Sequence, residues 1–140
     1  MGSVHLITIN PTLLTSNSYT HYWGVRDWES PKWQEAWAQL IKDVPKIIEE
    51  TKVKLSGPTD DEDVVTPVVV DIEEGIYLNG AQDGAYEPFI ISKKDTGSFN
   101  FCKTARRPYD AVVTCILLRA WMLAPDDFGP RCASWASLSF

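Results

Sequence analysis

The chain has 140 residues, of which 44% are hydrophobic and 23% charged, and its formal charge at pH 7 is −6. This length suits one domain with a buried core, and the near-average composition excludes a fibrous repeat, extended disorder and a disulfide-dense scaffold. The acidic balance repels phosphodiester backbones and anionic lipids, so we expect neither nucleic acid nor a membrane as a partner. We expect a soluble, cytoplasmic protein.

The cysteine pattern is not that of a metal site. The three cysteines are Cys102, Cys115 and Cys132. They form no Cys-x-x-Cys pair, and only His5 and His21 could complete a ligand set, so we expect no metal and no cofactor. The first residues do not have the pattern of a signal peptide, and the longest apolar stretch, 111–124, is too short to span a membrane.

The first half of the chain predicts one strand and one helical region. Residues 5–9 are rich in β-branched and apolar side chains, which favours a strand. Residues 15–29 are polar and aromatic and include Trp23 and Trp28. Ser30 and Pro31 are typical of a helix start, and apolar residues then recur at three- and four-residue steps up to residue 48. Pro45 interrupts this pattern and predicts a kink or a break into two helices.

The second half predicts strands followed by a helix. Residues 56–66 are acidic and rich in Gly and Pro, which favours a mobile loop. Four short β-prone runs follow, separated by turn residues, and suggest an antiparallel meander; the runs are 68–72, 76–78, 89–91 and 99–102. In the last run, Phe99 and Phe101 share one face. Pro108 then opens a helix that is apolar nearly all round up to residue 124, which is typical of a buried central element.

These elements predict an α+β fold in which an antiparallel sheet of four to five strands packs against two main helical segments. We expect residues 1–128 to form one globular domain with a mobile acidic loop at about 56–66. Residues 129–140 have no convincing periodicity, and we expect them to be a disordered tail.

The densest polar segment is 102–110, where a predicted strand meets the second helix. Lys103, Arg106 and Arg107 lie beside helix-start amides, and both features favour negative charge, so phosphate, carboxylate or sulfate could bind. We therefore expect an accessory or binding protein that takes a small anionic ligand or a protein partner at this junction. The alternative is structural: these cations pair with the acidic residues of 59–74 or with Asp110.

A second alternative is a small enzyme acting on an anionic small molecule. Cys102 could be a thiolate nucleophile because Lys103 and a helix start would lower its pKa, and Tyr109 could act in acid–base work. Either role would leave Arg106 and Arg107 to orient the substrate.

A third alternative is a protein-interaction domain. Trp33 and Trp37 are in register with the apolar face of the first helix, but Trp23 and Trp28 precede it. We therefore expect Trp23 and Trp28 to be exposed and to form a recognition surface with nearby aromatic residues.

The segment 101–110 carries a resemblance. Its sequence, Phe-Cys-Lys-Thr-Ala-Arg-Arg-Pro-Tyr-Asp, is similar to a segment of a group of small fungal and bacterial proteins for which no activity is established. The resemblance also includes residues 78–89 and 117–120. It covers about half of the chain, is most specific in 102–110, and implies a shared fold but no reaction. In that group a further acidic, Trp-containing segment and a helix follow a Pro-Asp-x-Phe motif, which is formed here by residues 125–128. Residues 129–140 depart from this pattern, as a frameshift, a retained intron or alternative splicing would produce.

Overall fold

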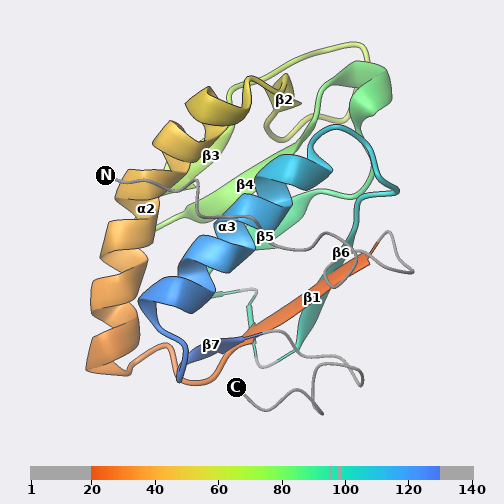
Figure 1. Ribbon diagram of the computed structural model, residues 1–140. Helices are drawn as coiled ribbons and strands as arrows, with labels where there is room; N and C mark the ends of the chain where they lie inside the picture. The colour runs from red at the N-terminus through yellow and green to blue at the C-terminus, as the bar shows by residue number, and fades with distance from the viewer. Residues whose placement is uncertain (1–19, 95, 98, 130–140) are drawn as a thin grey trace.

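The computed structural model describes residues 20–94, 96–97 and 99–129. In chain order the elements are β1 (Thr20–Val25), α2 (Pro31–Thr51), β2 (Leu55–Ser56), β3 (Val69–Asp71), β4 (Gly75–Gly80), the 3₁₀ helix η2 (Gln82–Gly84), β5 (Phe89–Ile91), β6 (Asn100–Lys103), α3 (Asp110–Leu123) and β7 (Phe128–Gly129). The antiparallel strands and the two helices confirm the predicted α+β class (Figure 1). The strand predicted at 5–9 and residues 130–140 of the predicted tail lie outside the described residues.

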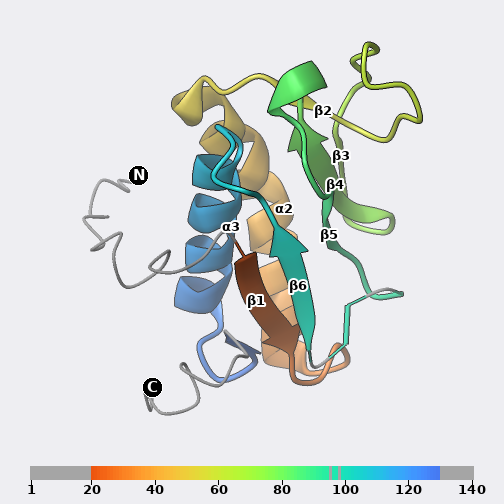
Figure 2. The same ribbon diagram turned by 90° about the vertical axis from the view of Figure 1, so that its right-hand side faces the viewer.

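The strands form two antiparallel sheets rather than one meander. One sheet has the order β6-β1-β7, and in the other β4 pairs with β2, β3 and β5. Three of the four predicted strands therefore pair as expected, but the prediction that β6 continues this meander is wrong. Its partner is β1, in a segment for which no strand was predicted. Figures 1 and 2 together show α2 and α3 on the same face of the strands.

Helix α2 begins at the predicted position and is not broken. Ser30 caps it by accepting the backbone N–H of Trp33, and Pro31 occupies the first turn, where no hydrogen-bond donor is needed. Pro45 lies inside the helix on an exposed position, so its ring meets solvent rather than the core. Of the two predicted alternatives, the break into two helices at Pro45 is wrong, because the helix runs unbroken to Thr51. The kink stays a prediction.

Helix α3 buries one face rather than its whole circumference. Val112, Val113, Ile116 and Ala120 are buried, whereas Met122 is 46% exposed. An apolar helix packed on one side against the sheet and α2 leaves its other side half-buried among the described residues. In this part of the chain no helix combines the length and the apolar character that crossing a membrane requires.

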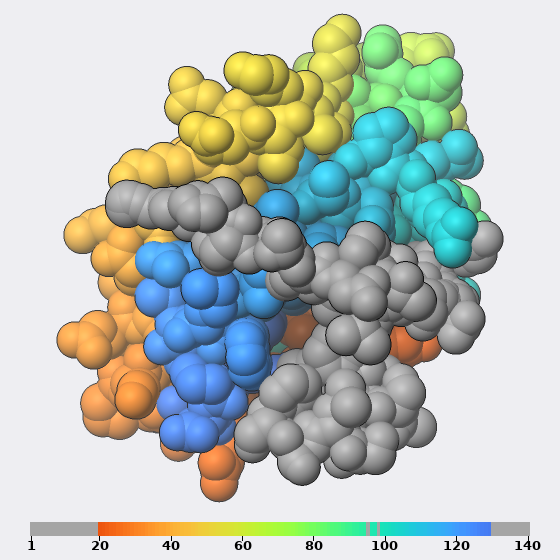
Figure 3. All heavy atoms as spheres, viewed as in Figure 1, coloured from red at the N-terminus to blue at the C-terminus, as the bar shows by residue number. Residues whose placement is uncertain are grey.

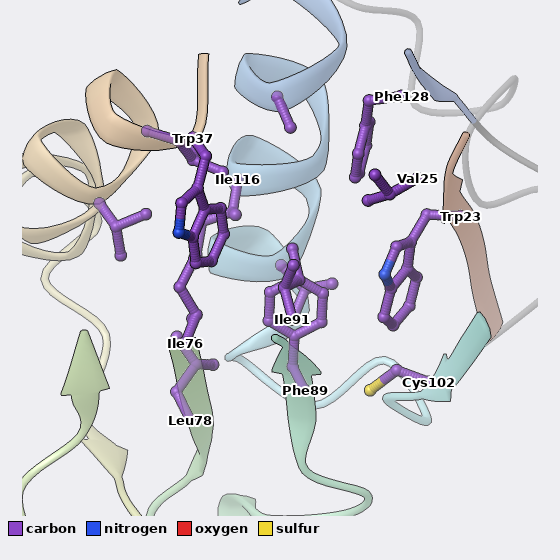
Figure 4. Close-up of a cluster of buried hydrophobic side chains, with 14 of the residues drawn as sticks. Trp23, Val25, Trp37, Ile76, Leu78, Phe89, Ile91, Cys102, Ile116 and Phe128 are labelled. Carbon is purple, nitrogen blue, oxygen red and sulfur yellow. The ribbon is translucent and has the colours of Figure 1, made fainter. Parts of the chain in front are cut away.

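The core lies between the helices and the inner faces of the strands (Figure 4). Trp23 packs against Phe89 at a ring-centroid distance of 5.1 Å, and Trp33 stacks on Phe128 at 5.6 Å. Burial of each large apolar side chain contributes about 1.5–3 kcal/mol, so these contacts between distant segments fix the position of β1 and β7.

The expected exposure of the two early tryptophans is wrong. Trp23 is only 2% exposed, because alternation along β1 directs it inward. Trp28 packs edge-on against Trp33 and Trp37 and donates its indole N–H to the carbonyl of Thr96 over 2.9 Å. Both side chains therefore belong to the fold rather than to a recognition surface.

The acidic loop between β2 and β3 has its own hydrogen bonds. The backbone N–H of Thr66 donates to the Ser56 hydroxyl and the N–H of Gly57 donates to the Thr66 carbonyl, which closes the loop at its base. A Cβ on Gly57 would lie 1.8 Å from the carbonyl oxygen of Pro67, so this close approach requires glycine. Two hydrogen bonds, one of them to a side chain, thus close the base of the loop.

Replacing Pro45 with Ala should stabilise the protein. The substitution restores an N–H that can donate to the carbonyl of Ile41 and removes the steric conflict of the ring, which costs about 3 kcal/mol in a free helix interior. We expect a gain of about 1–3 kcal/mol in the free energy of unfolding, measured by urea denaturation. The exposed Lys46→Ala change is the control and should alter stability by less than about 0.5 kcal/mol. A loss of stability in Pro45→Ala would contradict this account.

Candidate ligand-binding site at the end of strand β6

Residues 104–109 connect β6 to α3 through a tight turn. Ala105 and Arg106 both have left-handed backbone conformations, with φ of 51° and 58°, and the N–H of Arg107 donates to the Thr104 carbonyl over 2.9 Å. Such conformations cost about 1–3 kcal/mol each in residues other than glycine, so surrounding contacts must hold them. In the space-filling view the connection reaches the surface beside the C-terminal end of α2 (Figure 3).

Glu87 and Tyr109 supply those contacts. The N–H of Glu87 donates to the Lys103 carbonyl over 3.2 Å, and its carboxylate accepts the N–H of Lys103 over 2.8 Å. Tyr109 is fully buried, and its hydroxyl donates to the Glu87 carbonyl over 2.5 Å. These bonds join the end of β6, the segment before β5 and the start of α3. We call this set of bonds the Glu87–Tyr109 junction.

Gly80 allows the tyrosine ring to enter the junction. A Cβ at this position would lie 2.0 Å from the Gly84 carbonyl oxygen and 3.0 Å from the Tyr109 ring. Any other residue would displace either η2 or the ring, because both neighbours are already in place.

A buried polar cluster lies beside the junction. The Asp110 carboxylate accepts hydrogen bonds from His21 Nε2 over 2.6 Å and from the Thr104 hydroxyl over 2.5 Å. Because an ionised carboxylate can only accept, Nε2 of His21 carries the hydrogen. Burial raises the pKa of Asp110, but the two hydrogen bonds, the attraction to His21 and the positive charge of Arg106 together hold this pKa below the usual value of an aspartate. The cluster ties β1 to α3.

The catalytic candidates are buried and already bonded. Cys102 is 1% exposed, and its thiol lies 3.5 Å from the Glu87 carbonyl oxygen. Burial, together with the negative charge of Glu87, raises the pKa of the Cys102 thiol to about 12. His21 is the cross-strand neighbour of Cys102, yet its hydrogen bond goes to Asp110. Burial also raises the pKa of Tyr109, and its contact with Cys102 adds to this effect. These environments give no support to a thiolate nucleophile or a phenolate base.

The helix-start amides are not free, which corrects the expected anion site. The N–H groups of Asp110, Ala111 and Val112 donate to the carbonyls of residues 107, 108 and 109. The N–H donors that an anion would use are therefore already hydrogen-bonded to carbonyls of the tight turns before the helix. Only the side-chain cations of the expected site are left to bind a ligand.

The three cations differ in their surroundings. Arg106 is exposed and acts electrostatically on Asp110, as the structural alternative predicted. Lys103 and Arg107 are also exposed, but neither forms an ion pair with any residue that the structure describes. The Arg107 guanidinium lies over the Tyr86 ring at 5.8 Å from its centroid.

Sequence reasoning missed three aromatic side chains as a group. Tyr22, Phe99 and Phe101 contact one another, with ring centroids 5.8–6.4 Å apart. The prediction that Phe99 and Phe101 share one face is confirmed, since their side chains are 56% and 52% exposed. Cys102, which follows Phe101 and projects from the opposite face, is buried. Tyr22 could have been found only if β1 had been predicted.

Among the described residues, no group of three or more metal-ligating side chains is present.

Asp110→Asn should destabilise the protein in a pH-dependent way. Since the folded-state pKa of Asp110 is lowered, its carboxylate contributes fully above the unfolded pKa of about 3.9, and this contribution is lost as the pH falls through the folded pKa. We expect a loss of about 1.5–3 kcal/mol at pH 7, the range for hydrogen bonds to a charged group. Urea denaturation between pH 7 and pH 2.5 measures it. A difference between variant and native chain that does not change with pH would contradict this account.

Cys102 should be unreactive in the folded protein. At neutral pH a thiol with a pKa of about 12 is almost entirely protonated, and burial blocks access. Mass spectrometry after a short pulse of iodoacetamide should find the Cys102 peptide unlabelled in buffer and labelled in 8 M urea. Rapid labelling in buffer would restore the enzyme alternative.

Comparisons of the chain with protein-family models, with curated proteins and with solved structures find no significant match. The resemblance of residues 101–110 to a group of small fungal and bacterial proteins therefore stays a prediction.

Proposed function

We propose that this protein is a non-catalytic binding protein that holds a small anionic ligand with the side chains of Lys103 and Arg107. One observation carries the proposal: both cations are exposed and unpaired among the described residues, although they extend from a rigid junction. Arg106 contributes positive charge nearby, but Asp110 offsets part of it.

The charge distribution supports a small ligand rather than a polyanion. The chain as a whole carries a charge of −6, so a long anionic polymer would be repelled by most of the surface. A compact anion can approach Lys103 and Arg107 without that repulsion, because exposed charges more than about 10 Å away are largely screened at 0.1 M salt. A cytoplasmic location is part of this proposal.

Binding is favoured over catalysis because the reactive groups are bonded within the fold. Cys102, Tyr109 and Asp110 each have a hydrogen-bond partner inside the junction or the polar cluster. A nucleophile or general base must reach the substrate, and these side chains instead hold β6 and α3 in position. The exposed groups at the end of β6 can attract and orient a ligand.

The double variant Lys103→Ala/Arg107→Ala should lose phosphate binding. In the native chain, inorganic phosphate should raise the melting temperature above the value in sodium chloride of equal ionic strength, because a ligand that binds only the folded state stabilises it. This difference should vanish in the variant. The unfolding free energy without phosphate should change by less than about 0.5 kcal/mol, since the two side chains are exposed.

Lys42→Ala/Lys46→Ala is the matched control, because it removes two exposed cations from α2 and leaves β6 untouched. It should keep the phosphate response. Glu87→Gln should strengthen the response, since the amide oxygen still accepts the Lys103 N–H while the nearby negative charge is lost. A phosphate response that is absent from the native chain, or equal in both double variants, would refute the proposal.

A further inference from the structure

Three aromatic side chains contact one another on one surface, which we call the aromatic face and define as Tyr22, Phe99 and Phe101. Phe99 and Phe101 are exposed, and Tyr22 is half-buried. Tyr22 and Phe101 are cross-strand partners in the β1–β6 pair. Phe99 contacts both, with ring centroids 5.8 Å and 6.4 Å away. Single exposed apolar residues are common on soluble proteins, but three contiguous aromatic rings are the kind of surface that binds a partner.

The aromatic face lies on the side of the sheet away from the core. His21, Trp23 and Cys102 alternate with its members along the two strands and are buried. Side chains of a strand alternate between the two faces, so Tyr22 and Phe101 project from the opposite face. No described helix covers that face, because α2 and α3 pack together on the core side (Figure 2).

The aromatic face ends at the proposed anion site. Lys103 is exposed, follows Phe101 by two residues and therefore projects from the same face, about 7 Å further along the strand. The register places Thr20 opposite Lys103, so a small polar side chain lies beside the cation. An apolar surface of mutually tilted aromatic rings and a positive charge are thus adjacent, at a spacing that a sugar or another short linker covers.

We propose that the ligand is a small compound with a planar aromatic ring and one negatively charged group, as in a nucleoside monophosphate. This inference rests on the proposed anion site and specifies its ligand class. The ring stacks on the aromatic face, and the anionic group contacts Lys103 and Arg107. Aromatic side chains on a sheet bind heteroaromatic rings in this way, since every such ring has a π-face available for stacking.

The net negative charge of the chain favours a small ligand over single-stranded nucleic acid. Proteins that bind single strands also stack bases on aromatic side chains, but they need a positively charged groove that follows the nucleic acid backbone. Apart from the residues near the end of β6, the described surface includes the acidic side chains Asp71, Glu73 and Glu74 at the β3–β4 turn. One anionic group can be satisfied at Lys103 and Arg107, whereas a polymer with many phosphate groups would be repelled by the net charge of −6.

Calorimetric titration of the full chain with four probes tests the inference. The probes are adenosine 5′-monophosphate, ribose 5-phosphate, adenosine and inorganic phosphate. Adenosine monophosphate should bind at least about fivefold more tightly than ribose 5-phosphate, the lower end of what stacking one base contributes. Phe101→Leu, which keeps an apolar side chain but removes the ring, should abolish this advantage and leave ribose 5-phosphate binding unchanged.

Tyr77→Leu is the matched control, because Tyr77 is a half-buried aromatic residue of β4 in the other sheet. It should bind all four probes as the native chain does. Circular dichroism and thermal denaturation should show that both leucine variants are folded. Lys103→Ala should weaken binding of adenosine monophosphate and ribose 5-phosphate alike.

Each contrary result has one meaning. Equal binding of adenosine monophosphate and ribose 5-phosphate, both sensitive to Lys103→Ala, would overturn the aromatic ligand class but keep the anion site. Absence of binding by all four probes would overturn both. Binding of oligo-dT at least tenfold tighter than the monophosphate would overturn the small-ligand inference in favour of a nucleic acid strand. A dimer by light scattering that Phe101→Leu converts to a monomer would show that a second copy covers the face, and would also overturn it.

Discussion

The hydrogen bonds of Glu87 and Tyr109 are the constraint on which the rest of this structure depends. One buried tyrosine hydroxyl and one glutamate bring together three segments that the chain would otherwise leave apart: the end of β6, the entry to β5 and the start of α3. An unmade hydrogen bond at a buried polar group costs about 1–3 kcal/mol, so these bonds strongly favour one arrangement of the two sheets. That arrangement also holds the left-handed turn at Ala105 and Arg106.

The same junction separates groups that stabilise the fold from groups that can bind. Cys102, Tyr109 and Asp110 point inward and are bonded, whereas Lys103 and Arg107 lie at the surface. Residues that are neighbours in sequence therefore differ in role, some stabilising the fold and others lying free to bind. The reason is that side chains alternate between the two faces of β6, and the tight turn after β6 reverses the direction of the chain. The aromatic face extends the same principle along β6, since Phe99, Phe101 and Lys103 share one side.

Local patterns predicted part of this fold, and contacts between distant residues determined the rest. The helix start at Ser30 and the alternation of Phe99 and Phe101 follow from neighbouring residues, so the sequence predicted both. The pairing of His21 with Asp110 joins residues 89 positions apart, and no local pattern encodes it. The cationic cluster of the proposed site was likewise evident from the sequence. The hydrogen bonds of the helix-start amides, by contrast, depend on turns that the sequence does not show. Strand β1 was missed because its tryptophan and tyrosine residues suggested recognition rather than alternation.

Backbone chemical-shift mapping of the ¹⁵N-labelled chain with adenosine 5′-monophosphate is the most direct test of the account. The amide signals that move should be those of residues 20–23 in β1 and 99–107 at and after β6, with small changes at Tyr86, while the signals of α2 stay in place. Changes confined to other elements, or none at millimolar ligand, would contradict the claim that the end of β6 and its aromatic face form a binding site.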